Sequence, residues 1–135
     1  MSGPRFFYAV INISFDNSLY FDTYRNMEIK DAVKSLSALA YEHRLEVFRM
    51  LVRCGPEGMA AGDIAETLDM PPSSLSFHLS QMETAGLITR RREQRHIIYA
   101  ADIQGIRALL HFLTEDCCNG SPEICGNLID DVMNC

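Results

Sequence analysis

The segment from residue 60 to residue 100 constrains the fold more than any other part of this 135-residue chain. In its first part, 60–68, the apolar residues fall on one face of a short helix. The turn DMPP (69–72) follows, and proline is tolerated in the first turn of a helix because its missing N–H is not needed there. Apolar residues then recur at helical spacing over 71–86. The segment therefore predicts two short helices joined by a tight turn.

The second of these helices has an unusual outer face. Leu75, Leu79 and Met82 recur at i, i+4 and i+7, and Gly86 is a natural C-terminal cap. The opposite face carries serines and a phenylalanine, without the Glu–Lys pairs that usually cover a solvated helix. A solvated face is the alternative interpretation, but this composition favours contact with another molecule.

Two strands are expected next, at 87–92 and 95–100, with Glu93-Gln94 as the turn between them. That dipeptide lacks the Gly or Asn of a tight hairpin, so the tip is expected to be looser or longer. The stretch RRREQR (90–95) holds four arginines against one glutamate. A local basic patch thus survives in a chain of formal net charge −6, and charge distribution matters more than the total for nucleic-acid binding.

Three further helices flank this segment, at 28–40, 41–54 and about 102–115. The residues expected to point inward from the middle one are Leu45, Phe48, Leu51 and Val52. The first and last of these helices carry apolar residues over a wider face than packing against one small core requires. No apolar run reaches membrane-spanning length, so no membrane partner is expected.

The order and spacing of these elements resemble the ArsR/SmtB family of metalloregulatory repressors, over about residues 30–116. The resemblance rests on ALAYEHRLEVFRML (38–51), DIAETLDMPPSSLSFHLSQMETAGLI (63–88) and the basic hairpin at 91–100. It implies a mainly α, winged helix-turn-helix fold with a β-hairpin wing. It also implies a homodimer, with the first and last helices at the interface, that binds double-stranded operator DNA and is not an enzyme.

By this resemblance, the helix at 71–86 enters the major groove and presents side chains to base edges. The DNA-facing positions are Ser73, Ser74, Ser76 and Phe77, with His78 beside them and able to face either way. Phe77 departs from the more usual polar residue and could meet a thymine methyl group. The wing arginines, which would contact phosphates or a minor groove, are Arg90, Arg91, Arg92 and Arg95. Because Arg90 and Arg92 share one face of an alternating strand, not all four can touch DNA.

Two ligand sites of the family lack their residues in this chain. The region 58–66, where one variant places a Cys-x-Cys pair, holds no cysteine. The Asp-x-His pair of another variant reads Asp102-Ile103-Gln104, and His111 with Glu115 supplies too few ligands for zinc.

The stretch CCNGSPEIC (117–125) matches the CC-x-G-x-P-E-x-C pattern of the arsenic-responsive subgroup. The implied ligands are Cys117, Cys118 and Cys125, with As(III) or Sb(III) as the inducer and no organic cofactor. Soft thiolates select soft ions, and these trivalent ions favour three sulfurs, whereas zinc takes four ligands. Adjacent cysteines on a helix diverge by about 100°, so the helix has to end there. Gly120 permits such an ending.

Other interpretations of the cysteines stay open. A Cys117–Cys118 disulfide, or a redox-sensing repressor on the same fold, is one, and a Cys₃His zinc site is another. A thiol enzyme of arsenic metabolism is a third, although no Cys-x₅-Arg phosphate loop follows Cys54, Cys117 or Cys118. Cys54 is expected to be a small core residue, and Cys135 is terminal.

The chain is expected to divide into three parts: an N-terminal extension (1–26), the winged-helix domain (27–116) and a cysteine-rich sensing tail (117–135). The extension is rich in aromatics and Asn, and reads as an appended arm, an upstream start or an extra element packed on the dimer. Its segment FFYAVINI (6–13) is short for a signal peptide and lacks a cleavage site. A cytoplasmic protein with reduced cysteines is therefore expected.

Overall fold

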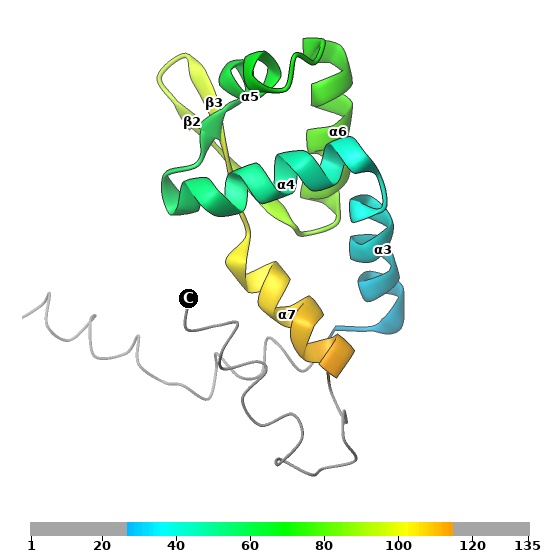
Figure 1. The fold of residues 1–135 in the computed structure, drawn as a ribbon. Helices are drawn as coiled ribbons and strands as arrows, with labels where there is room; N and C mark the ends of the chain where they lie inside the picture. Colours follow the sequence, from blue (N-terminus) through cyan, green and yellow to red (C-terminus); the bar gives the residue numbers. More distant parts are fainter. Residues whose placement is uncertain (1–26, 115–135) are drawn as a thin grey trace, which may run out of the picture.

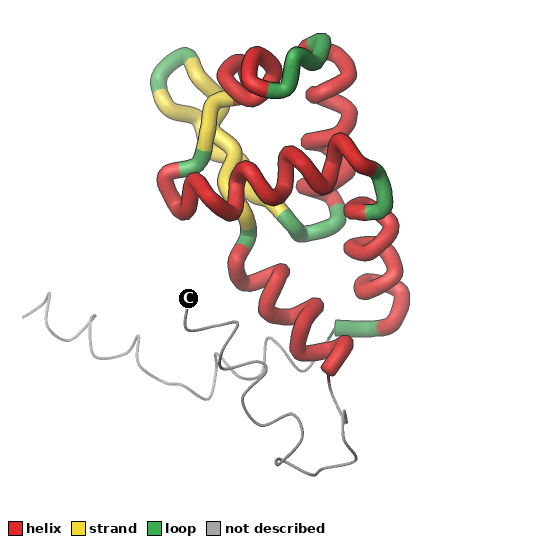
Figure 2. The backbone as a smooth tube through the Cα atoms, in the orientation of Figure 1, coloured by secondary structure: helices red, strands yellow, loops and turns green. Residues whose placement is uncertain are grey.

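The computed structural model describes residues 27–114 and has the predicted mainly helical architecture with a small antiparallel sheet (Figure 1). The elements are α3 (Ile29–Leu39), α4 (Glu42–Cys54), the 3-10 turn η2 (Gly55–Glu57), β1 (Met59–Ala60), α5 (Ala61–Thr67), α6 (Pro72–Thr84), β2 (Ile88–Glu93), β3 (His96–Ala101) and α7 (Ile103–Thr114). Figure 2 shows the β2–β3 hairpin at the upper left, α6 at the upper right, and α3 with α7 below them. The predicted winged helix-turn-helix fold is confirmed.

The core lies where α4, α5 and α6 meet the sheet. Its largest fully buried side chains are Val47, Leu51, Ile64, Leu75, Leu79, Met82, Leu87 and Ile88. The inward faces predicted for α5 and α6 are therefore confirmed. None of the helices in the described part of the chain is long and apolar enough to cross a membrane.

The prediction for α4 was wrong at two of its four inward residues. Leu45 and Val52 are each 44% exposed, whereas Val47 and Leu51 are completely buried. Two neighbouring apolar stripes run along this helix, and sequence periodicity alone cannot say which one faces α6 and β3. The observed stripe also includes Arg44, which is 6% exposed.

The sheet has the strand order β1-β3-β2, and both pairings are antiparallel. Glu93 pairs with His96, so the hairpin tip is the two-residue turn Gln94-Arg95, in which Gln94 adopts a positive φ of 53°. The turn thus lies one residue later than predicted and is tight rather than loose. The reason is that burial of Ile88, in register with Ala101, fixes the pairing from the other end of the hairpin.

Gly86 ends α6, as predicted, by adopting a positive φ of 74°. Its N–H donates to the carbonyl of Glu83 at 3.0 Å, and the Leu87 N–H donates to the carbonyl of Met82 at 3.0 Å. These two bonds form a Schellman motif, which turns the chain from α6 directly into β2. The length of α6 therefore sets where the wing begins.

The remaining helices, α3 and α7, leave apolar side chains exposed. On α3, the small residues Ala32, Ser35 and Ala38 face the protein. Larger side chains on these two helices are 44–72% exposed, namely Ile29, Val33, Leu36, Ile103 and Leu113. A single chain thus leaves uncovered the broad apolar faces that the sequence predicted for these two helices.

Candidate nucleic-acid interface and sensing region

The outer face of α6 presents the residues that were predicted to face DNA. Ser73, Ser74, Ser76 and Phe77 are all exposed, and Phe77 is 59% accessible. They occupy the first two turns of the helix, while the intervening Leu75 is 1% exposed and holds the helix to the core. A bulky aromatic ring on a serine-lined face is therefore available to a partner.

His78 faces α4 rather than the outer surface of α6. Its ring centroid lies 6.0 Å from that of His43, and both rings line a hollow of about 220 Å³ together with Ser74. The His78 Nδ1 atom is buried, and no hydrogen-bond partner for it lies within 27–114. Burial lowers the pKa of His78, and the nearby positive groups Arg44 and His43 lower it further. The sequence had left this orientation open.

Three of the four wing arginines are directed away from the protein core. Arg90 forms an ion pair with Glu83 at 3.1 Å, which ties the base of the wing to the end of α6. Arg92 donates from Nε to the Gln94 carbonyl at 3.3 Å, and Arg95 lies exposed in the hairpin turn. Among the described residues, Arg92 and Arg95 form no ion pair, so their charges are available to an anion.

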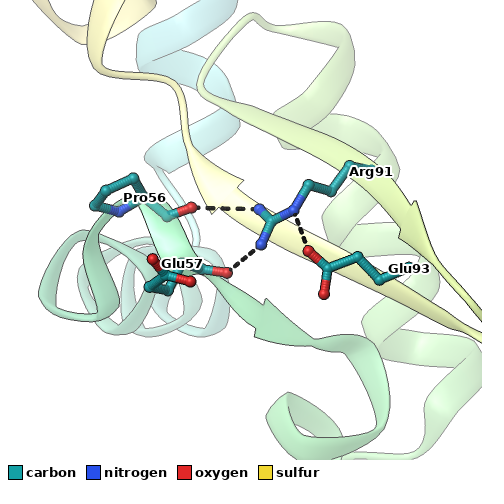
Figure 3. Close-up of polar contacts among 4 residues, drawn as sticks. All are labelled: Pro56, Glu57, Arg91 and Glu93. Atoms are coloured by element: carbon teal, nitrogen blue, oxygen red, sulfur yellow. Dashed lines mark hydrogen bonds and ion pairs between the residues drawn. The ribbon is translucent and has the colours of Figure 1, made fainter.

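Arg91 points to the opposite face of β2 and contacts the protein itself (Figure 3). Its Nε donates to the Glu93 carboxylate at 2.7 Å. The two terminal nitrogens donate to backbone carbonyls of η2, at 3.3 Å to Pro56 and at 2.6 Å to Glu57. These bonds attach the hairpin to the turn that follows α4. Sequence alternation showed that Arg91 differs in direction from Arg90 and Arg92, but gave no sign of its partners.

The predicted sensing cysteines, Cys117, Cys118 and Cys125, lie outside the described residues. In the part that is described, no group of three His, Cys, Asp or Glu side chains could hold a metal ion. Cys54 is partly buried at the end of α4 and is a free thiol.

Asp102, the first residue of the Asp-Ile-Gln stretch compared above with an Asp-x-His pair, makes structural contacts in this fold. Its carboxylate accepts hydrogen bonds from the backbone N–H groups of Gln104 and Gly105, at 3.0 and 3.1 Å. It therefore caps the start of α7. Its own N–H donates to the Leu87 carbonyl at 2.9 Å, so the start of α7 is joined to the base of the wing.

A family model described as "Helix-turn-helix domain" matches residues 39–91. The putative arsenical resistance operon repressor ArsR of Halobacterium salinarum is 37% identical over 70 residues, which are 52% of this chain and 54% of that protein. This chain thus spans little more than half the length of that relative.

Two solved structures resemble the described fold. The structure of NolR from Sinorhizobium fredii is 31% identical, covers 65% of this chain and 85% of its own, and has a TM-score of 0.51. A second structure is the homodimeric winged helix-turn-helix DNA-binding domain of Mb0332 from Mycobacterium bovis, a possible ArsR-family regulator. It is 23% identical, covers 65% of this chain and 82% of its own, and has a TM-score of 0.52.

Proposed function

The chain belongs to the ArsR family of winged-helix transcriptional regulators, and on that premise we propose that it is a homodimeric repressor whose operator binding is released by trivalent arsenic or antimony. The observation that carries the DNA-binding part is the exposed face of α6. Ser73, Ser74 and Ser76 offer hydroxyl groups to base edges, and Phe77 offers an apolar contact to a thymine methyl group.

In this proposal the wing holds the duplex through its backbone. Arg92 and Arg95 neutralise phosphates, and Arg90 does so when its ion pair with Glu83 opens. Arg91, which is bonded to η2, orients the hairpin instead of contacting DNA.

The dimer would form through α3 and α7. These helices expose large apolar side chains, whose contact with water is unfavourable and which a second copy of the chain would bury. The exposed fractions are 72% for Ile29, 55% for Val33 and 50% for Leu113. The homodimeric Mycobacterium bovis domain has the same fold. A two-fold dimer places its two α6 helices at half-sites about one helical turn apart.

The sensing step would take place at the three cysteines that follow the described part of α7 in the sequence. Cys117, Cys118 and Cys125 each lose a thiol proton and form one sulfur bond to the trivalent ion. The three hydroxyl groups of arsenite leave with those protons as three water molecules, and no electron is transferred. Three soft sulfur donors fit such an ion better than zinc. The relative from Halobacterium salinarum carries the name of an arsenical resistance operon repressor.

Coupling to DNA would run along α7. Gathering the three thiolates displaces the end of a helix that contributes to the dimer face and whose start is bonded to the wing through Asp102 and Leu87. Half-site spacing then changes. Allosteric couplings of this kind are typically about 1–3 kcal/mol, which is about 5- to 150-fold in affinity.

The test is arsenite-driven release of a labelled duplex, selected by the protein from a random library, followed by fluorescence anisotropy. The wild-type chain and a Cys54→Ser control should release DNA, and Cys118→Ser should remain bound. Release by arsenite from Cys118→Ser would refute the three-thiolate site. Release by peroxide without arsenite would favour the redox-sensing alternative.

A further inference from the structure

The first turn of α4 has no cap of its own. The N-cap residue Tyr41 makes no side-chain hydrogen bond to the helix, and the first three N–H groups, from Glu42 to Arg44, have no acceptor among residues 27–114. Free N–H groups and the positive end of the helix dipole favour a negative group at this position. A helix start alone does not identify an anion-binding site, so the charges of the neighbouring residues decide whether an anion is expected here.

Arg44, in that same turn, is a buried cation without an anionic partner. It is 6% exposed, its Nε has no hydrogen-bond partner, and no ion pair to it occurs within the described chain. Its guanidinium lies 4.0 Å from the centre of the Tyr41 ring. Burying an unpaired charge is costly. The Tyr41 ring beneath the guanidinium and the C-terminal ends of α3 and α6, which line the same hollow as Arg44, offset part of that cost.

The Arg44 side chain lines an open hollow of about 270 Å³ between α3, α4 and α6. Lys34 adds a second positive charge to this hollow, and Gln81 and Thr84 add polar groups from α6. Glu42 lies in the same turn, but it is exposed to solvent, and it does not line the hollow. The lining is therefore suited to a phosphate-sized oxyanion.

The position of this hollow relative to α6 points to the source of the anion. The first turn of α4 lies beside α6 (Figure 1). His43 of that turn lines one hollow with Ser74 and His78, and Arg44 lines the other with Gln81 and Thr84. When a recognition helix enters the major groove, phosphates of the duplex lie along its flanks. Gln81 and Thr84 follow Ser74 by about two and three helical turns, so this hollow lies toward the C-terminal end of α6.

We propose that the first turn of α4, with Arg44 and Lys34, binds a phosphate of the DNA backbone beside α6. This inference rests on the proposed DNA binding. It adds a contact from outside the recognition helix and the wing, one that strengthens binding to any sequence and fixes the angle at which α6 enters the groove.

The test uses the full chain and a labelled mixed-sequence duplex of about 30 base pairs, since phosphate contacts also support non-specific binding. Affinity is measured against salt concentration. Loss of one phosphate contact lowers the slope of log K against log [salt] by about 0.9. Arg44→Gln should show that decrease, and Arg44→Lys should show less of it. The matched control is Arg49→Gln, an exposed arginine on the same helix that should leave the slope unchanged.

Because Arg44 is buried, a second variant separates binding from folding. Lys34→Gln changes an exposed side chain of the same hollow and should also lower the slope. Unchanged slopes for both variants, with normal wild-type binding, would overturn this inference alone. A wild-type chain that binds no duplex would overturn the proposed function and this inference with it. Tight binding of inorganic phosphate to the free protein, with unchanged DNA slopes, would assign the hollow to a free anion and overturn the DNA contact.

Discussion

Replacing Arg91 by alanine removes the three hydrogen bonds that attach the wing to η2 and to Glu93 (Figure 3). The exposed pair with Glu93 contributes at most about 1 kcal/mol. A hydrogen bond to a charged donor contributes about 1.5–3 kcal/mol at most, and water replaces part of that here because the side chain is 40% exposed. A total loss of about 1–2 kcal/mol in the free energy of unfolding is expected.

The matched control is Arg92→Ala, the neighbouring residue on the opposite face of the same strand. Arg92 makes only the 3.3 Å contact with Gln94, so its loss should change stability by less than about 0.5 kcal/mol. It should instead lower the salt slope of duplex binding by about 0.9, while Arg91→Ala leaves that slope unchanged. Stability comes from denaturant unfolding followed by circular dichroism, and the slope comes from anisotropy. A lowered slope without lost stability for Arg91→Ala would refute its role as a wing anchor.

Three further predictions follow from the described residues. Gly58→Ala should cost about 2 kcal/mol in a denaturant titration, because Gly58 has a φ of 69° and an added Cβ would collide with the Tyr99 carbonyl; a neutral result would contradict the geometry. Val33→Asp should yield monomers by light scattering, whereas Val52→Asp, on an apolar site of α4 outside the proposed interface, should stay dimeric. Burial lowers the pKa of His78 below its ordinary value of 6.5, so at acid pH the unfolded chain binds more protons than the folded chain. The contribution of His78 to the free energy of unfolding is therefore complete above pH 6.5 and is lost as the pH falls. His78→Asn should therefore flatten the acid-side decline in melting temperature, and an unchanged profile would show that His78 does not cause it.

The parts of the fold that sequence could predict are those in which one interaction dominates. Leu75, Leu79 and Met82 on α6 are spaced for a single apolar face, and the structure buries all three. On α4, Leu45 and Val47 are both apolar, so only the packing of α6 and β3 decides that Val47 is buried and Leu45 is not.

The tertiary partners of polar residues were beyond sequence reasoning. The two η2 carbonyls that bind Arg91 lie 34 and 35 residues away along the chain, and no periodicity connects them. The direction of His78 likewise depends on where α4 crosses α6. The metalloid site is a different case: the motif of Cys117, Cys118 and Cys125 comes from the sequence, lies outside the described residues and stays a prediction.

The most direct test of the central claim is a titration of the operator-bound protein with arsenite. Two signals are recorded simultaneously: the anisotropy of the duplex and the near-ultraviolet absorbance of arsenic–thiolate bonds. The two signals should change together and reach their end points at one arsenic per chain, and both changes should be absent in Cys118→Ser. DNA release without thiolate absorbance, or absorbance without release, would contradict a repressor that senses the metalloid through these three cysteines.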